Sequence, residues 1–157
     1  IFLEHKLLYD MKCEVPDEDY LIPFGQAEFT REGDDITLVS VSNMVLNCNQ
    51  VADNLANDGI EADVIDLRTV SPIDEGAVLE SVEVSGRLVI VDEASERCSM
   101  ASEISSVVAE KAFKSLRAPI AKVTAPHTPV PFTPTLEKLY VPSVDRIEQA
   151  ARMTLEA

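Results

Sequence analysis

Short apolar runs alternate with amphipathic stretches along most of this chain. Residues 36–41, 60–67 and 87–91 are rich in β-branched and other apolar side chains, which predicts three strands. In the third of them, Leu88-Val89-Ile90-Val91 is apolar at every position, as expected of a central parallel strand covered on both faces. Residues 119–123 predict a fourth strand.

Between the strands, the apolar residues recur at helical spacing. They predict helices over residues 43–58, 72–84 and 99–116, and two short helices over residues 135–139 and 143–155. Alternation of strands and helices favours a mostly parallel open sheet with right-handed crossovers and helices on both faces. The predicted fold class is therefore α/β, a three-layer α/β/α sandwich.

Local signals mark the helix boundaries. Gly59 is expected to end the first helix with a positive φ. Ser71 is the expected N-cap of the second helix, with Pro72 at its first position and Asp74 in its first turn. Ser143 is the expected N-cap of the last helix.

The first 35 residues differ from the rest. Ile1-Phe2-Leu3 is an apolar triplet without an initiator Met, typical of the inside of a strand and of a fragment. Residues 11–35 are irregular and acidic. We therefore predict an entry strand and a wrapping linker over residues 1–35, and a single α/β domain over residues 36–157.

Charge and composition narrow the class of protein. A chain of 157 residues has the size of one domain, and its formal charge of −15 disfavours nucleic acid or anionic lipid as a partner. No apolar run is long enough for a membrane span, and the start lacks the pattern of a signal peptide. Three widely spaced cysteines favour a reducing compartment.

Motifs for cofactors and metals are absent from the sequence. The first strand-to-helix turn, Val41-Ser42-Asn43-Met44, has no glycine to cradle a phosphate. His5 and His127 are far apart and lie in no metal-binding spacing. We therefore predict neither a cofactor site nor a metal site in this chain.

Four side chains are weak candidates for chemistry. Asp92 and Glu93 follow an apolar strand, where open α/β sheets place functional groups, although a hydrogen-bonding role in the next loop is the favoured interpretation for them. Cys98 precedes a predicted helix, but Glu93 nearby opposes a thiolate. His127 lies in a loop with four prolines in nine residues, and we expect it to orient that loop by a hydrogen bond.

Several runs, in this order, resemble one family over nearly the whole chain. They resemble the C-terminal half of the beta subunit in the thiamine diphosphate-dependent dehydrogenase component of 2-oxo acid dehydrogenase complexes, a transketolase C-terminal-like domain. The most specific run is DLRTVSPID, which holds Arg68, Thr69, Pro72 and Asp74 as a structural motif. The others are IFLEHKLLY, PFGQAEFTREGDDITLVSVSNM, LVIVDEASERCSMASEI and APHTPVPFTPTLEKLYVPS.

Two runs resemble the acetoin dehydrogenase branch of that family. Cys98-Ser99-Met100 stands where the other branches usually carry a glycine pair, and His127 stands where they usually carry Asp. The resemblance therefore implies acetoin as the substrate of the intact enzyme, with pyruvate or another 2-oxo acid as the alternative.

The resemblance also implies where the chemistry lies. In the family, the alpha subunit binds the diphosphate of thiamine diphosphate and its magnesium. The N-terminal domain of the beta subunit supplies the glutamate that activates the aminopyrimidine. Glu4 is not that glutamate, because it lies in FLEHKLLY. No catalytic residue is therefore expected in this chain, with Glu93 and His127 as weak candidates, and the chain alone is not expected to be active.

The implied partners are the alpha subunit, a second beta subunit in a homodimer contact, and the dihydrolipoyl acyltransferase core. In relatives the core presents a basic subunit-binding domain, which an acidic surface attracts. The helix from Ser143 onward is the expected docking site. The implied location is the cytoplasm of a bacterium, or the mitochondrial matrix of a eukaryote.

Two alternatives remain open. A C-terminal domain of transketolase or deoxyxylulose phosphate synthase would need basic residues for a sugar phosphate, whereas the loops here are mainly acidic. A free-standing flavodoxin-like binding module is disfavoured by the missing phosphate loop.

Overall fold

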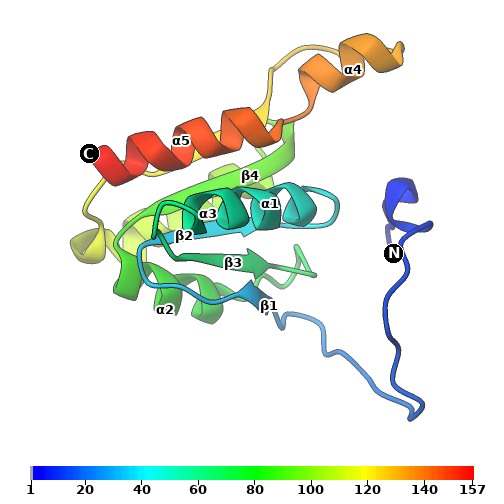
Figure 1. Cartoon of the computed structure of the whole chain (residues 1–157), viewed down its shortest axis with the longest axis horizontal. Coiled ribbons are helices and arrows are strands. Elements are labelled where there is room, and N and C mark those ends of the chain that lie inside the picture. Colours follow the sequence, from blue (N-terminus) through cyan, green and yellow to red (C-terminus); the bar gives the residue numbers. More distant parts are fainter. Residues whose placement is uncertain (1) are drawn as a thin grey trace.

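Four parallel strands and one antiparallel edge strand form the sheet of the computed structural model, which describes residues 2–157 (Figure 1). Their spatial order is β1-β3-β2-β4-β5. The strands are β1 (Glu28–Arg31), β2 (Ile36–Ser40), β3 (Ala62–Asp66), β4 (Leu88–Ser95) and β5 (Ala121–Ala125).

Helices cover both faces of the sheet. On one face lie α1 (Met44–Ala56) and α5 (Val144–Glu156), and on the other lie α2 (Glu75–Ser85) and α3 (Met100–Lys111). Short elements complete the chain: η1 (Lys6–Leu8), η2 (Phe113–Ser115) and α4 (Pro134–Tyr140). The predicted three-layer α/β/α sandwich is confirmed.

Period-two alternation divides the core between the two faces. In β2, Leu38 packs toward α1 and α5, whereas Val39 packs toward α2 and α3. In β4, Val89 and Val91 face the first pair of helices, and Ile90 faces the second. All five side chains are fully buried, which explains why the sequence of β4 is apolar at every one of its first four positions.

The direction of the crossovers changes beside β2. From β2 the chain passes through α1 to β3 on one side, and then returns through α2 to β4 on the other side. The carboxyl ends of β2 and β4 therefore flank a topological switch point, where open α/β sheets usually bind their ligands. Ser42 follows β2 there, and Glu93 lies near the end of β4.

The predicted start of the second helix is wrong. Helix α2 begins at Glu75, and its N-cap is Asp74, whose carboxylate accepts a hydrogen bond from Ala77 N at 3.1 Å. Residues 70–72 form a bend that precedes the helix, and the Ser71-Pro72 peptide is cis. The other oxygen of Asp74 accepts a hydrogen bond from Ala27 N of the incoming chain at 2.9 Å, so one carboxylate both caps α2 and holds the linker.

Other boundaries also differ from the prediction. Helix α3 ends at Lys111, and η2 follows in place of its last turn. The strand predicted over residues 87–91 continues to Ser95, and the one predicted over residues 119–123 is observed as β5, two residues later. Gly59 has φ +77° after α1, and Ser143 caps α5 through Arg146 N, as predicted.

The linker contains an element that the sequence analysis missed. Strand β1 lies in the segment taken as irregular, and it pairs antiparallel with β3 at the sheet edge. Phe2 and Leu3 are in no strand, contrary to the expected entry strand, while Ile1 lies outside the described residues. The division of the chain at residue 35 stays a prediction.

Residues 2–24, which we call the N-terminal arm, project from the body of the sheet (Figure 1). The arm contains only η1 as a regular element. Across residues 2–157, none of the helices has the length and apolarity needed to cross a membrane.

Candidate functional site

The carboxyl edge of the parallel strands carries a hollow that the N-terminal arm closes on one side. Its volume is about 460 Å³, and Phe2, Leu3, Phe24, Val41, Ser42 and Thr69 are among its lining residues. The arm therefore occupies the switch point, which is the place where a free-standing α/β module would leave room for a ligand.

A contact between His5 and Glu93 holds the arm to this edge. Nε2 of His5 lies 3.2 Å from Oε2 of Glu93, and the two side chains are only 28% and 29% exposed. Nδ1 of His5 also accepts a hydrogen bond from Leu7 N at 3.3 Å. Glu93, a weak catalytic candidate from the sequence, is thus placed against the arm.

The DLRTVSPID motif anchors the end of the arm and the start of β1. The carboxylate of Asp74 accepts a hydrogen bond from Ala27 N at 2.9 Å while it caps α2. Nη1 of Arg68 lies 2.9 Å from Oε2 of Glu28. Each contact joins one motif residue to the incoming chain, so the motif positions the linker on the domain.

Pro72 completes this anchor by close packing. A Cβ on Gly25 would meet Cγ of Pro72 at 2.9 Å, and Gly25 has φ +77°. Only glycine combines this φ with so close an approach to the proline ring. Thr69 lines the hollow beside these residues and donates its backbone N–H to Leu67 O.

Asp66 and Arg68 form a tight turn at the end of β3. Arg68 has φ +53°, in the left-handed region, and its N–H donates to Oδ1 of Asp66 at 2.9 Å. Burial raises the pKa of the Asp66 carboxyl above its ordinary value, and the hydrogen bond from Arg68 opposes that rise. The strained turn directs the Arg68 guanidinium outward to Glu28.

Asp92 ties down the loop between β4 and α3. Its carboxylate accepts hydrogen bonds from Ala94 N at 2.9 Å and from Ala101 N, in the first turn of α3, at 3.3 Å. The hydrogen-bonding role predicted for Asp92 is confirmed. Cys98, in the loop before α3, is exposed and has φ +51°.

His127 lies in an exposed loop after β5. Its predicted role of orienting the loop is not observed, since its side chain makes no hydrogen bond within residues 2–157. The phenol of Tyr140 in α4 instead donates to Thr128 O at 3.1 Å, and Thr128 N donates to Pro126 O at 2.8 Å. No ion pair or hydrogen bond joins His127 to Glu93 in the described chain, although β4 and β5 are neighbours.

The described residues do not fit thiamine diphosphate or its magnesium. No group of three or more His, Cys, Asp or Glu side chains within residues 2–157 is arranged to hold a metal ion. The turn after β2 has no glycine, and the amino end of α3 is capped by Asp92.

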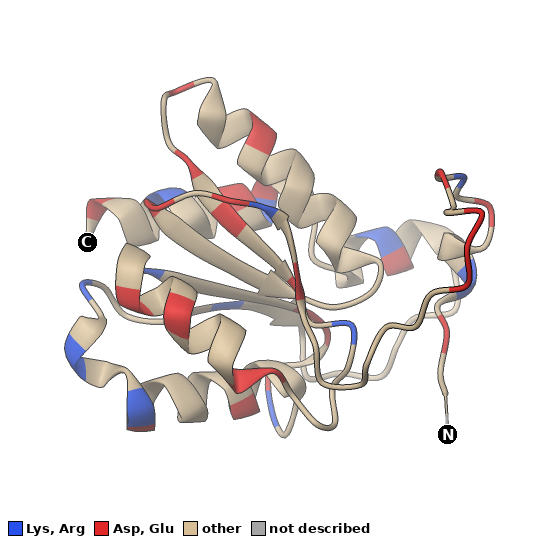
Figure 2. Ribbon diagram, turned by 90° about the horizontal axis from the view of Figure 1, so that it is seen from below, with Lys and Arg blue, Asp and Glu red and all other residues tan. Residues whose placement is uncertain are grey.

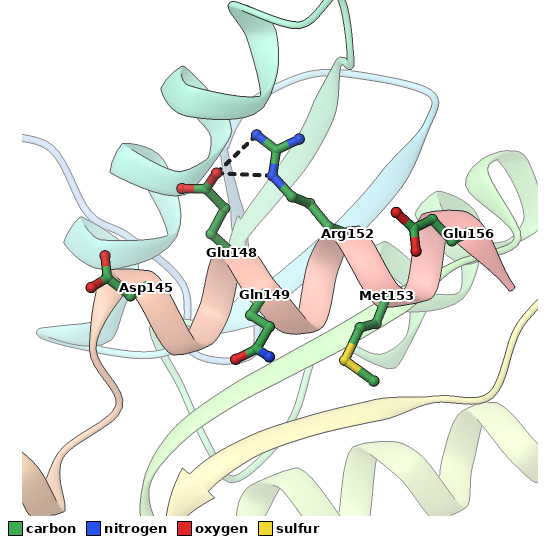
Figure 3. Close-up of a pocket in the computed structure, with 6 residues that line it drawn as sticks. All are labelled: Asp145, Glu148, Gln149, Arg152, Met153 and Glu156. Carbon is green, nitrogen blue, oxygen red and sulfur yellow. Dashed lines mark hydrogen bonds and ion pairs between the residues drawn. The ribbon is translucent and has the colours of Figure 1, made fainter.

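The outer face of α5 forms a second candidate surface, a shallow depression lined by Asp145, Glu148, Gln149, Arg152, Met153 and Glu156 (Figure 3). Arg152 bridges Oε1 of Glu148 and Oδ2 of Asp58 at 2.8 and 2.7 Å. Asp145 and Glu156 are exposed and form no ion pair within residues 2–157. This face therefore presents two free carboxylates beside the exposed Met153.

His5 and Gly25 were missed as contributors to the carboxyl edge. Both lie far in sequence from Glu93 and Pro72, and local patterns carry no signal for such contacts. A partial signal was present for Gly25, because a glycine between Phe24 and Gln26 in an extended segment indicates a special φ or a close approach.

The chain matches the model of a known family over residues 25–147, namely the C-terminal domain of transketolase. Among curated relatives, the acetoin:2,6-dichlorophenolindophenol oxidoreductase subunit beta of Cupriavidus necator is 54% identical over 99% of this chain and 46% of its own length. The subunit of the same name in Bacillus subtilis is 50% identical over 93% of this chain and 43% of its own length.

A solved structure, described as split gene transketolase, inactive beta4 tetramer, superposes with a TM-score of 0.76 at 26% identity. It covers 92% of this chain and 46% of that one. The chain spans about half the length of the curated relatives it matches. The family resemblance inferred from the sequence is confirmed, and the match extends over most of the chain: the protein belongs to the transketolase C-terminal domain family.

Proposed function

We propose that this chain is the C-terminal assembly domain of the beta subunit of a thiamine diphosphate-dependent acetoin dehydrogenase, or of a dehydrogenase for pyruvate or another 2-oxo acid. In this role the domain pairs subunits and docks the acyltransferase core. The observation that carries the proposal is the 54% identity to an acetoin oxidoreductase beta subunit over 99% of the chain.

The distribution of exposed apolar side chains supports an assembly role. Phe132, just before α4, is 99% exposed, and Leu139, within α4, is 75% exposed. In the arm, Leu3 and Leu21 are 89% and 96% exposed. The arm and α4 project on the same side of the sheet (Figure 1). Apolar surface gathered in this way is typical of a protein interface. We assign α4 and the start of the arm, around Leu3, to contact with the N-terminal half of the beta subunit and with the alpha subunit.

Catalytic groups are proposed to lie outside this chain. Glu93 is engaged with His5, and His127 has no second titratable partner within residues 2–157. Thiamine diphosphate and magnesium therefore belong, in this proposal, to the rest of the assembled enzyme. The chain alone is expected to be inactive toward acetoin and pyruvate.

Docking to the dihydrolipoyl acyltransferase is proposed to use the outer face of α5. Asp145 and Glu156 lie eleven positions apart on one helix, which separates them by roughly 17 Å along its axis. Met153 and Gln149 lie between them (Figure 3). Two free carboxylates around an exposed methionine suit a small basic binding domain, whose attraction to this acidic chain would raise the rate of association.

Calorimetric titration with the subunit-binding domain of the cognate acyltransferase tests this docking. We expect binding that weakens when NaCl is raised from about 50 mM to about 300 mM, because exposed charges are screened over that range. The variant Asp145→Asn/Glu156→Gln is expected to bind at least about threefold more weakly.

A matched control removes the same number of charges elsewhere. Glu103 and Glu110 are exposed residues of α3, on the opposite face of the sheet from α5. The variant Glu103→Gln/Glu110→Gln is expected to bind like the parent. Absence of binding by the parent at both salt concentrations, or equal weakening by the two variants, would refute docking on α5.

The proposed location is the bacterial cytoplasm, which the bacterial relatives and the three unpaired cysteines support. A eukaryotic source would place the enzyme in the mitochondrial matrix. The sugar-phosphate alternative is weaker, because the relatives at 50% identity or more carry acetoin oxidoreductase names.

A further inference from the structure

A groove beside the end of α3 combines an apolar floor with basic side chains. We call it the basic groove and define it by Ala109, Phe113, Lys114, Leu116, Arg117 and Ile120. Phe113 is 70% exposed there, although aromatic side chains of this size gain the most from burial. The apolar floor therefore favours a partner that brings apolar side chains of its own.

The two cations of the groove lack partners. Neither Lys114 nor Arg117 forms an ion pair within residues 2–157, whereas neighbouring Lys111 is paired with Glu75. The two cations lie on one apolar groove in a chain that is otherwise strongly acidic, with 28 acidic and 13 basic residues. They favour a partner segment that is acidic.

Arg117 is held in position by the turn after α2. Its N–H donates to Gly86 O at 2.8 Å, and a Cβ on Gly86 would meet Cγ of Arg117 at 2.7 Å. The arginine stem thus lies on a glycine with φ +69°, which leaves space that no other residue type would leave. This packing fixes the position of the first side-chain carbons of Arg117. The guanidinium group is therefore held near one place in the groove.

The N-terminal arm carries the complementary pattern. Asp17-Glu18-Asp19 is followed directly by Tyr20-Leu21-Ile22, and all six residues are exposed. Tyr20, Leu21 and Ile22 are 57%, 96% and 49% exposed. Within residues 2–157 these six residues belong to no helix or strand, so the segment can lie extended along a groove.

The arm cannot reach the groove of its own chain. Figure 1 shows the arm at one end of the molecule and the turn after α3 at the other. Figure 2 shows Asp and Glu gathered along the arm, and Lys and Arg gathered around the end of α3 and η2. A contact between these two features therefore requires a second molecule.

We propose that residues 17–22 of one copy of this chain dock in the basic groove of a second copy. The acidic triplet faces Lys114 and Arg117, and the apolar triplet covers Phe113 and Leu116. Because arm and groove lie at opposite ends, two copies packed side by side in opposite directions form both contacts at once, as twofold symmetry requires.

This assignment deepens the subunit pairing of the proposed function and rests on that part of it alone. Self-association is measured without the acyltransferase. Failure of docking to the core therefore leaves the arm and groove assignment intact, and failure of the arm and groove assignment leaves docking on α5 intact.

Sedimentation equilibrium of the 157-residue chain is the first measurement. We expect a monomer-dimer equilibrium that weakens with added salt. The groove variant Lys114→Glu/Arg117→Glu and the arm variant Asp17→Lys/Glu18→Lys/Asp19→Lys are each expected to raise the dimer Kd by about tenfold or more, because each turns attraction into repulsion at both contacts.

Mixing the two variants distinguishes the loss of this contact from unfolding of a variant. In a mixed dimer, the basic arm of one variant meets the acidic groove of the other, and the unchanged arm meets the unchanged groove. The mixture is therefore expected to dimerise with a Kd near that of the parent, although each variant alone does not. Restored pairing also shows that both variants are folded.

A control reverses two cations outside the groove. Lys122 in β5 and Lys138 in α4 are exposed, and Lys122→Glu/Lys138→Glu changes the net charge as much as the groove variant does. This control is expected to dimerise like the parent. The proposal is overturned if the parent is monomeric, if the control weakens the dimer as much as the groove variant, or if the mixture of variants fails to pair.

Discussion

His5 and Glu93 join the start of the described chain to the end of the central strand β4, with Nε2 and Oε2 3.2 Å apart. The pair lies at the switch point of the sheet, so the arm covers the position at which related open sheets bind ligands. The same contact explains why Glu93 need not be catalytic in this chain. Its carboxylate serves the attachment of the arm.

Replacing Glu93 by Gln is expected to loosen the arm and to leave the domain folded. Removal of a partly exposed histidine–carboxylate contact costs about 1 kcal/mol or less, which is enough to raise the population of the detached arm several-fold. Limited proteolysis should therefore cleave within residues 10–24 faster, while the urea midpoint changes little.

The control for this variant is Glu96→Gln. Glu96 pairs with Arg97 at the surface, where both side chains are more than half exposed, and it does not contact the arm. Equal proteolysis of the parent and the Glu93→Gln variant would show that the contact between His5 and Glu93 does not hold the arm.

Most of the core was predictable because it depends on local periodicity. The apolar run of β4 and the helical spacing of Met44, Cys48 and Leu55 each indicate which side chains are buried, and all of these are buried in the structure. The layers follow from the order of the elements, since a buried parallel sheet needs helices on both faces.

The candidate site was predictable only in part because its contacts are long-range. Glu93 was recognised from its place after a strand, but its partner His5 lies in a segment with no periodicity. Strand β1 was missed because only four residues form it, at an edge where alternate side chains are exposed. Asp74 was expected in the first turn of the second helix, whereas it is the N-cap of that helix. The local pattern of helix-forming residues carries no signal for the cis Ser71-Pro72 peptide before it.

The three cysteines are expected to differ in their rate of alkylation, with two fast thiols and one slow thiol. Burial raises the pKa of the Cys48 thiol to about 12, against a hydrogen bond with Ser40 that lowers it, whereas Cys13 and Cys98 are exposed. At pH 8 roughly one Cys48 thiol in 10⁴ is ionised, and the thiolate is the reactive form. Alkylation of the native protein should modify two thiols, and the third should react only after addition of denaturant.

The double variant Cys13→Ser/Cys98→Ser isolates the slow thiol. It is expected to show no rapid reaction when native and one reactive thiol when unfolded. Rapid modification of this variant under native conditions would contradict the burial of Cys48.

Gly33 is expected to be intolerant of any side chain. A Cβ at this position would lie 2.6 Å from Ala62 N, and that backbone is fixed in the sheet. Gly33→Ala should therefore lower the free energy of unfolding by about 3 kcal/mol. In Gly59→Ala, where φ is +77° but no atom lies within 4 Å, the loss should be about 1 kcal/mol. Equal losses in urea unfolding would contradict the close approach at Gly33.

The free energy of unfolding is expected to depend on pH through Glu148, which bridges α1 and α5. Asn54 Nδ2 donates to its Oε2 at 2.7 Å, and Arg152 donates to its Oε1 at 2.8 and 2.9 Å. These bonds, with that of Asn54 first, lower the pKa of Glu148 below its ordinary value of 4.5. A lowered pKa means that the folded state favours the carboxylate, so the stabilisation is complete above pH 4.5 and is lost as the pH falls through the lowered value.

The variant Glu148→Gln tests this dependence, because the amide keeps the shape of the side chain and loses its charge. At pH 7 the variant should unfold more easily than the parent by about 1 kcal/mol or less, since Arg152 is partly exposed and its charge is screened. The difference should shrink as the pH falls from 4.5 through the lowered pKa, because the carboxylate of the unfolded parent is protonated first and that of the folded parent only at the lower value. Glu137→Gln in α4, an exposed position without an ion pair in residues 2–157, should differ little from the parent at either pH. If the free energies of unfolding of the parent and of Glu148→Gln differ by the same amount from pH 7 down to about 3, then the shape of the side chain, and not its charge, stabilises the contact between the two helices.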